Sequence, residues 1–362
     1  MSKNLIGALA LVASLLCTFA FAQTASPAPK DTLKVGFVFV SPIGEAGWTY
    51  QHDLGRAAME RAHGGRVQTT VIESVAEGAD SERVMRDLAS RGHQLIFATS
   101  FGYLEPALRV AAEFPDVKFE HAGGYKTAPN LTTYNARYYE GRYLAGLVAG
   151  AVSRSGVAGY VAGFPVPEVI QGINAFTIGM RAANPKAQVR VLWLNTWFDP
   201  AREREAAFSL INQGADVLTN HSASPAVAIA AEEKGVKLIA YQSDMRKFAP
   251  KAQLTSVTHQ WGGYYTQAAK AVLDGTWKPK PVWGGLRDGF IALAPLSADV
   301  PKATAALVQS RQSEIIAGRF HPFEGRIVDT TGSVRQAAGV MSDDAIAKMD
   351  YFVQGVLGSA PK

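Results

Sequence analysis

Cysteine is almost absent from this chain, whose 362 residues include a single one, Cys17. Cys17 lies inside an apolar amino-terminal segment that we predict to be cleaved, so the mature chain contains no cysteine. Without thiols, the mature protein has no disulfide, no cysteine nucleophile and no thiolate-bound metal.

The common catalytic motifs are also missing. The sequence contains no G-x-S-x-G, no H-E-x-x-H, no phosphate-binding loop and no G-x-G-x-x-G after a predicted strand. Two acidic pairs, Asp80 with Glu82 and Asp343 with Asp344, lie at predicted helix starts, where capping explains them. His221 has no second His or Cys at ligand spacing, which argues against a metal site. We therefore expect a protein that is not an enzyme and needs no cofactor or metal.

Charge of either sign is modest and scattered along the chain. There are 36 Lys and Arg against 31 Asp and Glu, a formal net charge of +5, and removal of Lys3 with the amino-terminal segment lowers it by one. This balance indicates no nucleic-acid surface. Beyond the amino terminus no run is long and apolar enough to cross a membrane. The remaining length, about 340 residues, is typical of two domains.

The first 22 residues have the pattern of a secretion signal. Lys3 gives a positive start, residues 5–19 are almost wholly apolar, and Ala-Phe-Ala at 20–22 provides a cleavage site near Ala22. Lipidation at Cys17 is the alternative, but Leu16 precedes it where lipidation signals usually have Gly or Ala. Soluble export is therefore favoured.

Residues 23–31, which follow the signal, are rich in Ser, Pro and Ala and are predicted to form a flexible tether. The stretch 34–60 then begins with the apolar run Val35–Val40, continues in a loop that contains Trp48 and Tyr50, and ends in a helix-period pattern. Strand, loop and helix in this order are typical of a parallel α/β sheet, in which ligands bind at the carboxyl ends of the strands.

Similar strand and helix units continue along the chain in two series. We predict an α/β fold with two doubly wound parallel-sheet lobes, the first formed by residues 32–128 plus 253–284 and the second by residues 129–252 plus 285–362. No short-period repeat is present, which excludes a solenoid.

Aromatic residues collect just after the predicted strands. The candidates are Trp48, Tyr50, Phe101, Phe164 and Trp197. Aromatic side chains from opposite lobes can enclose a planar ring and leave its polar edge for hydrogen bonds. Packing in the core or at the rim explains any one of them equally well. Their shared position predicts a binding surface, with Trp48 and Trp197 as the strongest candidates.

Polar candidates occupy similar positions. They are Asn220, His221, Gln242, Asp244 and His259 after strands, and Glu168 at a helix start. Amides and carboxylates in a closed cleft can read the donors and acceptors of a heterocycle. For Glu168 there is a structural alternative, because an acid in the first turn stabilises the helix dipole.

Segments spread over most of the mature chain resemble the basic membrane protein family of receptors for ABC importers. The resemblance rests on VGFVFVSPIGEAGWTYQHDLGR (35–56), EGRYLAGLVAG (140–150), VAGFPVPEVIQGINAFTIGMRAANP (161–185), TWFDPAREREAA (196–207), QGADVLTNHSASPAV (213–227) and QLTSVTHQWGGYY (253–265). It implies a cluster B periplasmic binding protein, with two α/β lobes joined by three crossovers. It also implies a purine or purine-nucleoside ligand and an inner-membrane ABC permease as partner.

The resemblance also suggests how the ligand is held. Many family members have an Asp-Lys-Ser-Phe-Asn type first loop, and here Trp48 and Tyr50 take the positions that hold the nucleoside. Trp197 or Phe198 would stack from the second lobe. The Asp-Ser-Asp of the family is Gln-Ser-Asp at 242–244, and a frequent Lys is replaced by His259.

The lost acid and lysine commonly serve a ribose in such receptors. Their absence favours a free nucleobase, with adenine as the first expectation and a nucleoside as the second. The alternatives are the same fold with a sugar, pyrimidine or autoinducer, an exported nucleoside-processing enzyme, and a sensor domain that docks on a membrane kinase.

Overall fold

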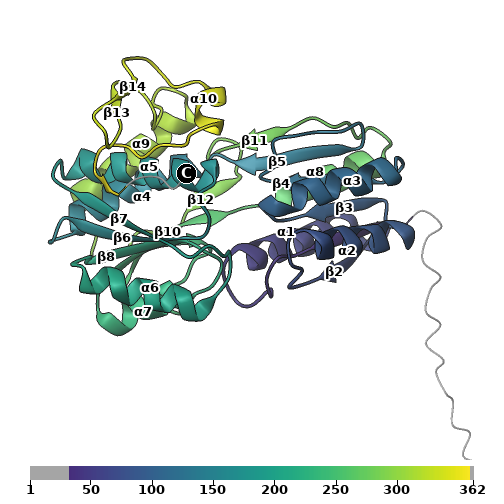
Figure 1. Cartoon of the computed structure of the whole chain (residues 1–362), viewed down its shortest axis with the longest axis horizontal. Helices are drawn as coiled ribbons and strands as arrows, with labels where there is room; N and C mark the ends of the chain where they lie inside the picture. Colours follow the sequence, from purple (N-terminus) through teal and green to yellow (C-terminus); the bar gives the residue numbers. More distant parts are fainter. Residues whose placement is uncertain (1–31, 359–362) are drawn as a thin grey trace, which may run out of the picture.

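Two lobes, each with its own mainly parallel sheet, lie side by side and are joined by three chain crossovers (Figure 1). The computed structural model describes residues 32–358. The predicted signal segment, residues 1–22, and the predicted tether, residues 23–31, lie outside the described residues, as do residues 359–362.

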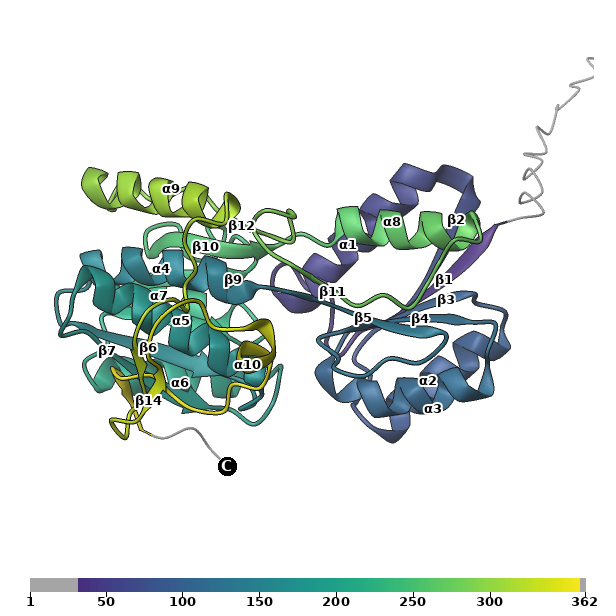
Figure 2. The ribbon, with the colours of Figure 1, turned by 90° about the horizontal axis from the view of Figure 1, so that it is seen from above.

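The first lobe contains a six-stranded sheet in the order β11-β5-β4-β3-β1-β2, with all neighbours parallel. Its strands are β1 (Leu33–Val38), β2 (Val67–Ile72), β3 (Leu95–Ala98), β4 (Lys118–Ala122), β5 (Leu131–Ala136) and β11 (Val282–Gly284). Helices α1 (Trp48–His63) and α8 (Gly262–Leu273) cover one face, and α2 (Ala79–Ser90) and α3 (Leu104–Glu113) cover the other (Figure 2). Because helices cover both faces, the apolar run of β3 is buried throughout.

The second lobe contains a seven-stranded sheet in the order β12-β10-β9-β8-β6-β7-β15, parallel except for the pair β10 and β12. Its strands are β6 (Val157–Ala162), β7 (Gln188–Trp193), β8 (Val217–His221), β9 (Lys237–Gln242), β10 (Gln253–His259), β12 (Ile291–Leu293) and β15 (Val356–Leu357). Helices α4 (Tyr138–Val152), α5 (Pro167–Ala183) and α9 (Lys302–Ile316) lie on one side, and α6 (Pro200–Asn212) and α7 (Ala226–Lys234) lie on the other (Figure 1).

Helix α4, which is rich in glycine and alanine, packs closely against α5. A Cβ added at Gly146 would lie 2.2 Å from the carbonyl oxygen of Phe176 on α5, and one added at Gly179 would lie 2.1 Å from that of Tyr143. The two backbones therefore touch where only glycine fits.

The three crossovers are Arg137 between β5 and α4, residues 260–261 between β10 and α8, and residues 285–290 between β11 and β12. They confirm the predicted architecture of two lobes, but two predicted boundaries are wrong. The boundary at 128 excludes β5 from the first lobe, and the one at 253 assigns β10 to it, whereas β5 pairs with β4 and β10 pairs with β9. The sequence pattern of a strand that leads into a crossover is the same whichever sheet the strand joins. Only its pairing partners determine its lobe.

The carboxyl-terminal segment packs on α5. It contains the hairpin of β13 (Ile327–Val328) and β14 (Val334–Gln336), the short helix α10 (Asp343–Ala347) and the edge strand β15. The side chain of Ser342 caps α10 by accepting a hydrogen bond from the backbone N–H of Ala345. Within residues 32–358, no helix has both the length and the apolar character that a membrane span requires.

Candidate functional site

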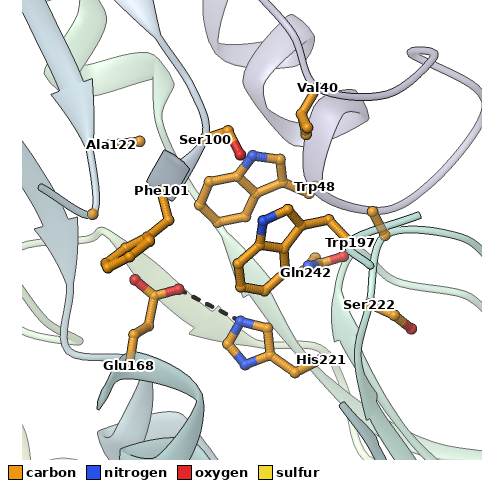
Figure 3. A pocket seen from close by; sticks show the side chains of 12 residues that line it. Val40, Trp48, Ser100, Phe101, Ala122, Glu168, Trp197, His221, Ser222 and Gln242 are labelled. Carbon is orange, nitrogen blue, oxygen red and sulfur yellow. Dashed lines mark ion pairs between the residues drawn. The ribbon is translucent and has the colours of Figure 1, made fainter. Parts of the chain in front are cut away.

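A cavity lies between the lobes, where strands of both sheets end (Figure 3). It contains about 430 Å³ of space not filled by protein atoms, part of it open to solvent. It is lined from the first lobe by Val40, Trp48, Ser100, Phe101, Ala122 and Gly123, and from the second by Glu168, Trp197, His221, Ser222, Ala223 and Gln242. Residues far apart in the sequence meet here because the carboxyl ends of parallel strands gather at one edge of each sheet.

Trp48 projects into the cavity from the first turn of α1 (Figure 3). Its indole Nε1 donates a hydrogen bond of 2.7 Å to the carbonyl oxygen of Thr99, just after β3. On the same side, Phe101 begins the 3-10 turn η2 (Phe101–Tyr103) and directs its ring into the cavity. The first lobe thus presents aromatic surface whose Trp48 ring is already fixed in orientation.

Trp197 enters the cavity from the loop between β7 and α6 (Figure 3). The Trp197 ring lies against the backbone of Gly163, where an added Cβ would come within 2.7 Å of the ring. The ring of Phe164 packs edge-on against Trp197, with 4.9 Å between the two ring centroids. The indole Nε1 is 3.2 Å from a carboxylate oxygen of Glu77, to which it donates across the two lobes. Closure of the lobes therefore gives Trp197 a hydrogen bond that it lacks when they separate.

Glu168, in the first turn of α5, points its carboxylate into the cavity (Figure 3). Oε2 accepts a hydrogen bond of 3.0 Å from the side-chain amide of Asn135, which comes from β5 of the first lobe. Oε1 lies 3.5 Å from Nε2 of His221, at the end of β8. The carboxylate is therefore held by one contact from each lobe and still faces the cavity.

His221 is buried, and burial lowers the pKa of its imidazole. The Glu168 carboxylate acts in the opposite direction, and the Arg142 guanidinium adds to the lowering. Nδ1 of His221 has no hydrogen-bond partner within residues 32–358. At neutral pH the ring is therefore uncharged, with its proton best placed on Nε2, toward Glu168.

Gln242, the last residue of β9, adopts φ 67°, in the left-handed region that residues other than glycine rarely occupy. Its side chain is buried, and its amide oxygen has no partner among the residues that the structure describes. Backbone strain and an unsatisfied acceptor at a cavity wall are both typical of functional positions.

Several contacts hold the lobes together beside the cavity. The backbone N–H of Gly47 and the amide of Gln51 donate to the Ser243 hydroxyl at 2.8 and 2.9 Å. At the rim, Lys247 pairs with Glu45 at 2.6 Å. A Cβ on Gly47 would lie 2.0 Å from the carbonyl oxygen of Ala223. The structure is therefore the closed form, and Gly47 lies at its tightest point.

Six of the predicted binding residues line the cavity, namely Trp48, Phe101, Glu168, Trp197, His221 and Gln242. The other five predicted binding residues do not line it. Tyr50 lies on α1, and Phe164 supports Trp197. The Asn220 amide donates to the carbonyl of Ser222, and the Asp244 carboxylate pairs with Arg246. His259 is buried behind Trp48, with their ring centroids 5.6 Å apart.

Sequence reasoning missed two kinds of residue. Val40, Ser100, Ala122, Gly123, Ser222 and Ala223 line the cavity but are small or apolar, and their only signal is their position at strand ends. Glu77, Asn135 and Ser243 orient the site across the lobes. No residue-type pattern distinguishes these three from other loop polar residues.

The placement of the side chains around the cavity does not support a metal centre. Within residues 32–358, no group of three or more His, Cys, Asp or Glu side chains is placed to hold an ion. What the cavity offers is aromatic surface, one carboxylate acceptor, a neutral imidazole and an amide. These groups suit reversible binding of a planar heterocycle.

Comparison with known proteins identifies the family of the chain. The family model described as ABC transporter substrate-binding protein PnrA-like matches residues 32–319. A purine-binding protein of Brucella abortus is 47% identical over 334 residues, which cover 92% of this chain and 95% of that protein. A putative ABC transporter glucose-binding protein of Haloferax volcanii is 35% identical, over 92% of this chain and 83% of that one.

Solved structures support the fold. A solute-binding protein of an ABC transporter system from Aeropyrum pernix superposes with a TM-score of 0.72 at 17% identity, covering 87% of this chain and 95% of that one. A second, from Conexibacter woesei, gives a TM-score of 0.62 at 24% identity, over 80% and 98% of the two chains. The chain is a binding protein and not an enzyme, and it belongs to the PnrA-like family of ABC transporter substrate-binding proteins.

Proposed function

We propose that this protein is the periplasmic receptor of an ABC importer and binds a purine nucleobase, adenine first, in the cavity between its lobes. The observation that carries the proposal is the meeting of Trp48 and Phe101 from one lobe with Trp197 from the other, beside Glu168, His221 and Gln242. A purine has two apolar faces and an edge of donors and acceptors. Aromatic walls suit its faces, and the polar groups suit its edge.

The polar groups favour a free base over a nucleoside. Glu168 supplies a carboxylate, which only accepts hydrogen bonds. A free purine carries an N–H on its five-membered ring, whereas in a nucleoside this nitrogen is bonded to the sugar. Asp244, the acid retained from the pattern that serves a ribose, is paired with Arg246 and does not line the cavity.

The relatives support the purine more than a sugar. The Brucella relative is named as purine-binding, and the Haloferax relative as glucose-binding. Sugars also stack on Trp, but they need several acid and amide partners. This cavity is lined by one acid, Glu168, and one amide, Gln242. Export through the predicted signal segment and membership of this family support a periplasmic location and an inner-membrane permease as partner.

The test is thermal unfolding of the mature protein, beginning at Gln23, with adenine, guanine, hypoxanthine, adenosine, inosine, uridine, ribose and glucose. A ligand at a hundred times its dissociation constant stabilises the folded state by about 2.7 kcal/mol, which a shift in melting temperature reveals. We expect the free bases to give the largest shifts. Larger shifts with nucleosides or glucose would reject the nucleobase, and no shift with any purine would reject the proposed function.

Glu168→Gln sharpens the same test. A hydrogen bond to a charged group is worth about 1.5–3 kcal/mol, so we expect adenine affinity to fall about tenfold to a hundredfold, measured by calorimetry. Glu205→Gln, at an exposed position on α6, removes the same charge outside the cavity and should leave affinity within twofold. Equal affinities of the two variants would remove Glu168 from the site.

A further inference from the structure

Arg142 is a fully buried cation that has no carboxylate partner in the part of the chain that the structure describes. It lies on α4 with 0% of its surface exposed, and it forms none of the ion pairs found within residues 32–358. A buried charge without a counter-ion is costly, because its removal from water is not offset by an opposite charge. Such a residue needs an explanation.

The guanidinium lies directly behind the polar wall of the cavity. One Nη donates a hydrogen bond of 2.9 Å to the Thr219 hydroxyl, and the other donates to the carbonyl oxygen of Asn220, the residue before His221. The guanidinium carbon lies 3.4 Å from the ring centroid of Tyr241, and the ring of Tyr241 also contacts that of His221, with 4.7 Å between the two ring centroids. Two short paths therefore connect Arg142 with His221.

The titratable groups around His221 come from α4, α5, β9 and β10. Glu168 on α5 provides the negative charge, 3.5 Å from Nε2, and Arg142 on α4 provides the positive one. Tyr138 on α4, Tyr241 on β9 and, beyond Tyr241, His259 on β10 complete the surroundings. Both tyrosines have raised pKa values through burial, and burial lowers that of His259 well below its ordinary value. Arg142 and Glu168 are thus the two charged groups of this cluster at neutral pH.

The alternative to a neutral His221 is an imidazolium paired with Glu168. Its second proton would lie on Nδ1, a buried atom for which residues 32–358 offer no acceptor. The Arg142 guanidinium, which keeps its charge in proteins, repels that state as well. A His221 imidazolium would also offset the negative charge of the Glu168 carboxylate, and so weaken it as an acceptor for the ligand, which a neutral ring does not do.

We propose that Arg142 is a positioning residue of the cavity, which keeps His221 uncharged with its Nε2–H toward Glu168 and so keeps the Glu168 carboxylate available to an N–H group of the ligand. This inference rests on the proposed function for the identity of the ligand. It predicts a receptor that binds a neutral N–H donor heterocycle equally well across mildly acidic and neutral pH.

The test measures adenine affinity by calorimetry from pH 5.5 to 8.5, a range in which adenine is uncharged. In the wild-type protein we expect a change of less than twofold. Arg142→Met keeps the length and removes the positive charge that opposes protonation of His221. The pKa of His221 should therefore rise, although burial continues to lower it, and affinity should fall several-fold by pH 5.5 while the wild-type profile stays flat. Arg142→Lys restores the charge and should restore the flat profile. Arg204→Met removes a partly exposed arginine of α6 and should also leave the profile flat.

A second measurement needs neither ligand nor variant. The ¹⁵N chemical shifts of the His221 ring in the wild-type protein report its tautomer and its titration. We expect a neutral ring protonated on Nε2 at pH 6.5 and above. A charged His221 at pH 6.5, or a flat affinity profile in folded Arg142→Met protein, would overturn the inference. Absence of purine binding by the wild-type protein would instead reject the proposed function.

Discussion

The two walls of the cavity differ in how completely their polar groups are satisfied. On the first-lobe wall, the Trp48 indole donates to Thr99 and the Ser100 hydroxyl donates to Glu77 at 2.6 Å. On the second-lobe wall, Nδ1 of His221 and the amide oxygen of Gln242 have no partner among residues 32–358. Unsatisfied buried polar atoms are costly unless a ligand or water meets them.

This difference suggests that the two lobes contribute differently to binding. The first lobe supplies shape, because its aromatic surface is fixed before a ligand arrives. The second lobe supplies recognition, because its acceptors and donors still need partners. A ligand bound to one lobe alone would have only one set of contacts, so the contacts made by both lobes together favour the closed form.

The largest expected effect comes from a change that keeps the two walls apart. Gly47→Ala introduces a Cβ that would lie 2.0 Å from the carbonyl oxygen of Ala223, so the lobes cannot close fully. We expect adenine affinity to fall at least a hundredfold, and small-angle scattering to show no compaction when adenine is added.

Gly44→Ala is the matched control for backbone strain. Gly44 belongs to the same loop and also has a positive φ, 58°, but an added Cβ would meet no atom within 4 Å. This variant should lose some stability and keep most of its affinity and its compaction. If both variants lose affinity equally, strain in the loop rather than closure explains the effect.

A smaller effect tests the aromatic part of the comparison. Trp197→Ala removes a stacking ring and its closure-dependent hydrogen bond to Glu77. Base–aromatic stacking is worth about 1–3 kcal/mol and a hydrogen bond about 0.5–1.5 kcal/mol, so together we expect adenine affinity to fall at least tenfold, measured by calorimetry, in a protein that remains folded.

Trp193→Ala, at the end of the strand β7 that precedes the Trp197 loop, is the control for Trp197→Ala. The Trp193 ring packs nearly parallel to Phe352, with centroids 6.4 Å apart, and does not line the cavity. That variant should melt at a lower temperature with nearly unchanged affinity. Unchanged affinity in Trp197→Ala would remove Trp197 from the site.

The sequence predicts the cavity best where its residues follow strands. Trp48 and Trp197 each come shortly after an apolar run, and parallel topology then brings both to the same edge. Pairings across the lobes have no such signal, because Glu77 meets Trp197 over a separation of 120 residues. Asp244 shows that a position after a strand does not by itself make a residue part of the cavity. It follows a strand as expected, yet Arg246, two residues further on, takes its carboxylate.

The same reasoning explains why the fold class was predictable and the lobe boundaries were not. Alternating apolar runs and helix-period stretches define the number and type of the elements, which is a local property. Assignment of β5 and β10 to a lobe depends on pairing with β4 and β9, which is a long-range property. Resemblance to a family shows that crossovers exist, and their positions come from the strand pairings.

The smallest effect on binding is expected from Glu120, a buried carboxyl of the first lobe. Burial raises its pKa to about 7, although the Tyr264 hydroxyl donates to it at 2.6 Å and the Trp277 indole at 2.8 Å. Because this pKa lies above the ordinary value of about 4.5, the folded protein binds the proton more tightly than the unfolded chain does. The stabilisation is fully present below pH 4.5 and is lost as the pH rises through about 7.

Glu120→Gln should therefore stabilise the protein at pH 8 by about 1–3 kcal/mol and give a much smaller gain at pH 5, as measured by urea unfolding at both values. The amide can accept from Trp277 and donate to the Tyr264 oxygen, so the local hydrogen bonds are kept. Adenine affinity should change little, because Glu120 does not line the cavity. A gain that is equal at both pH values would show that packing, not the buried charge, limits the stability of this lobe.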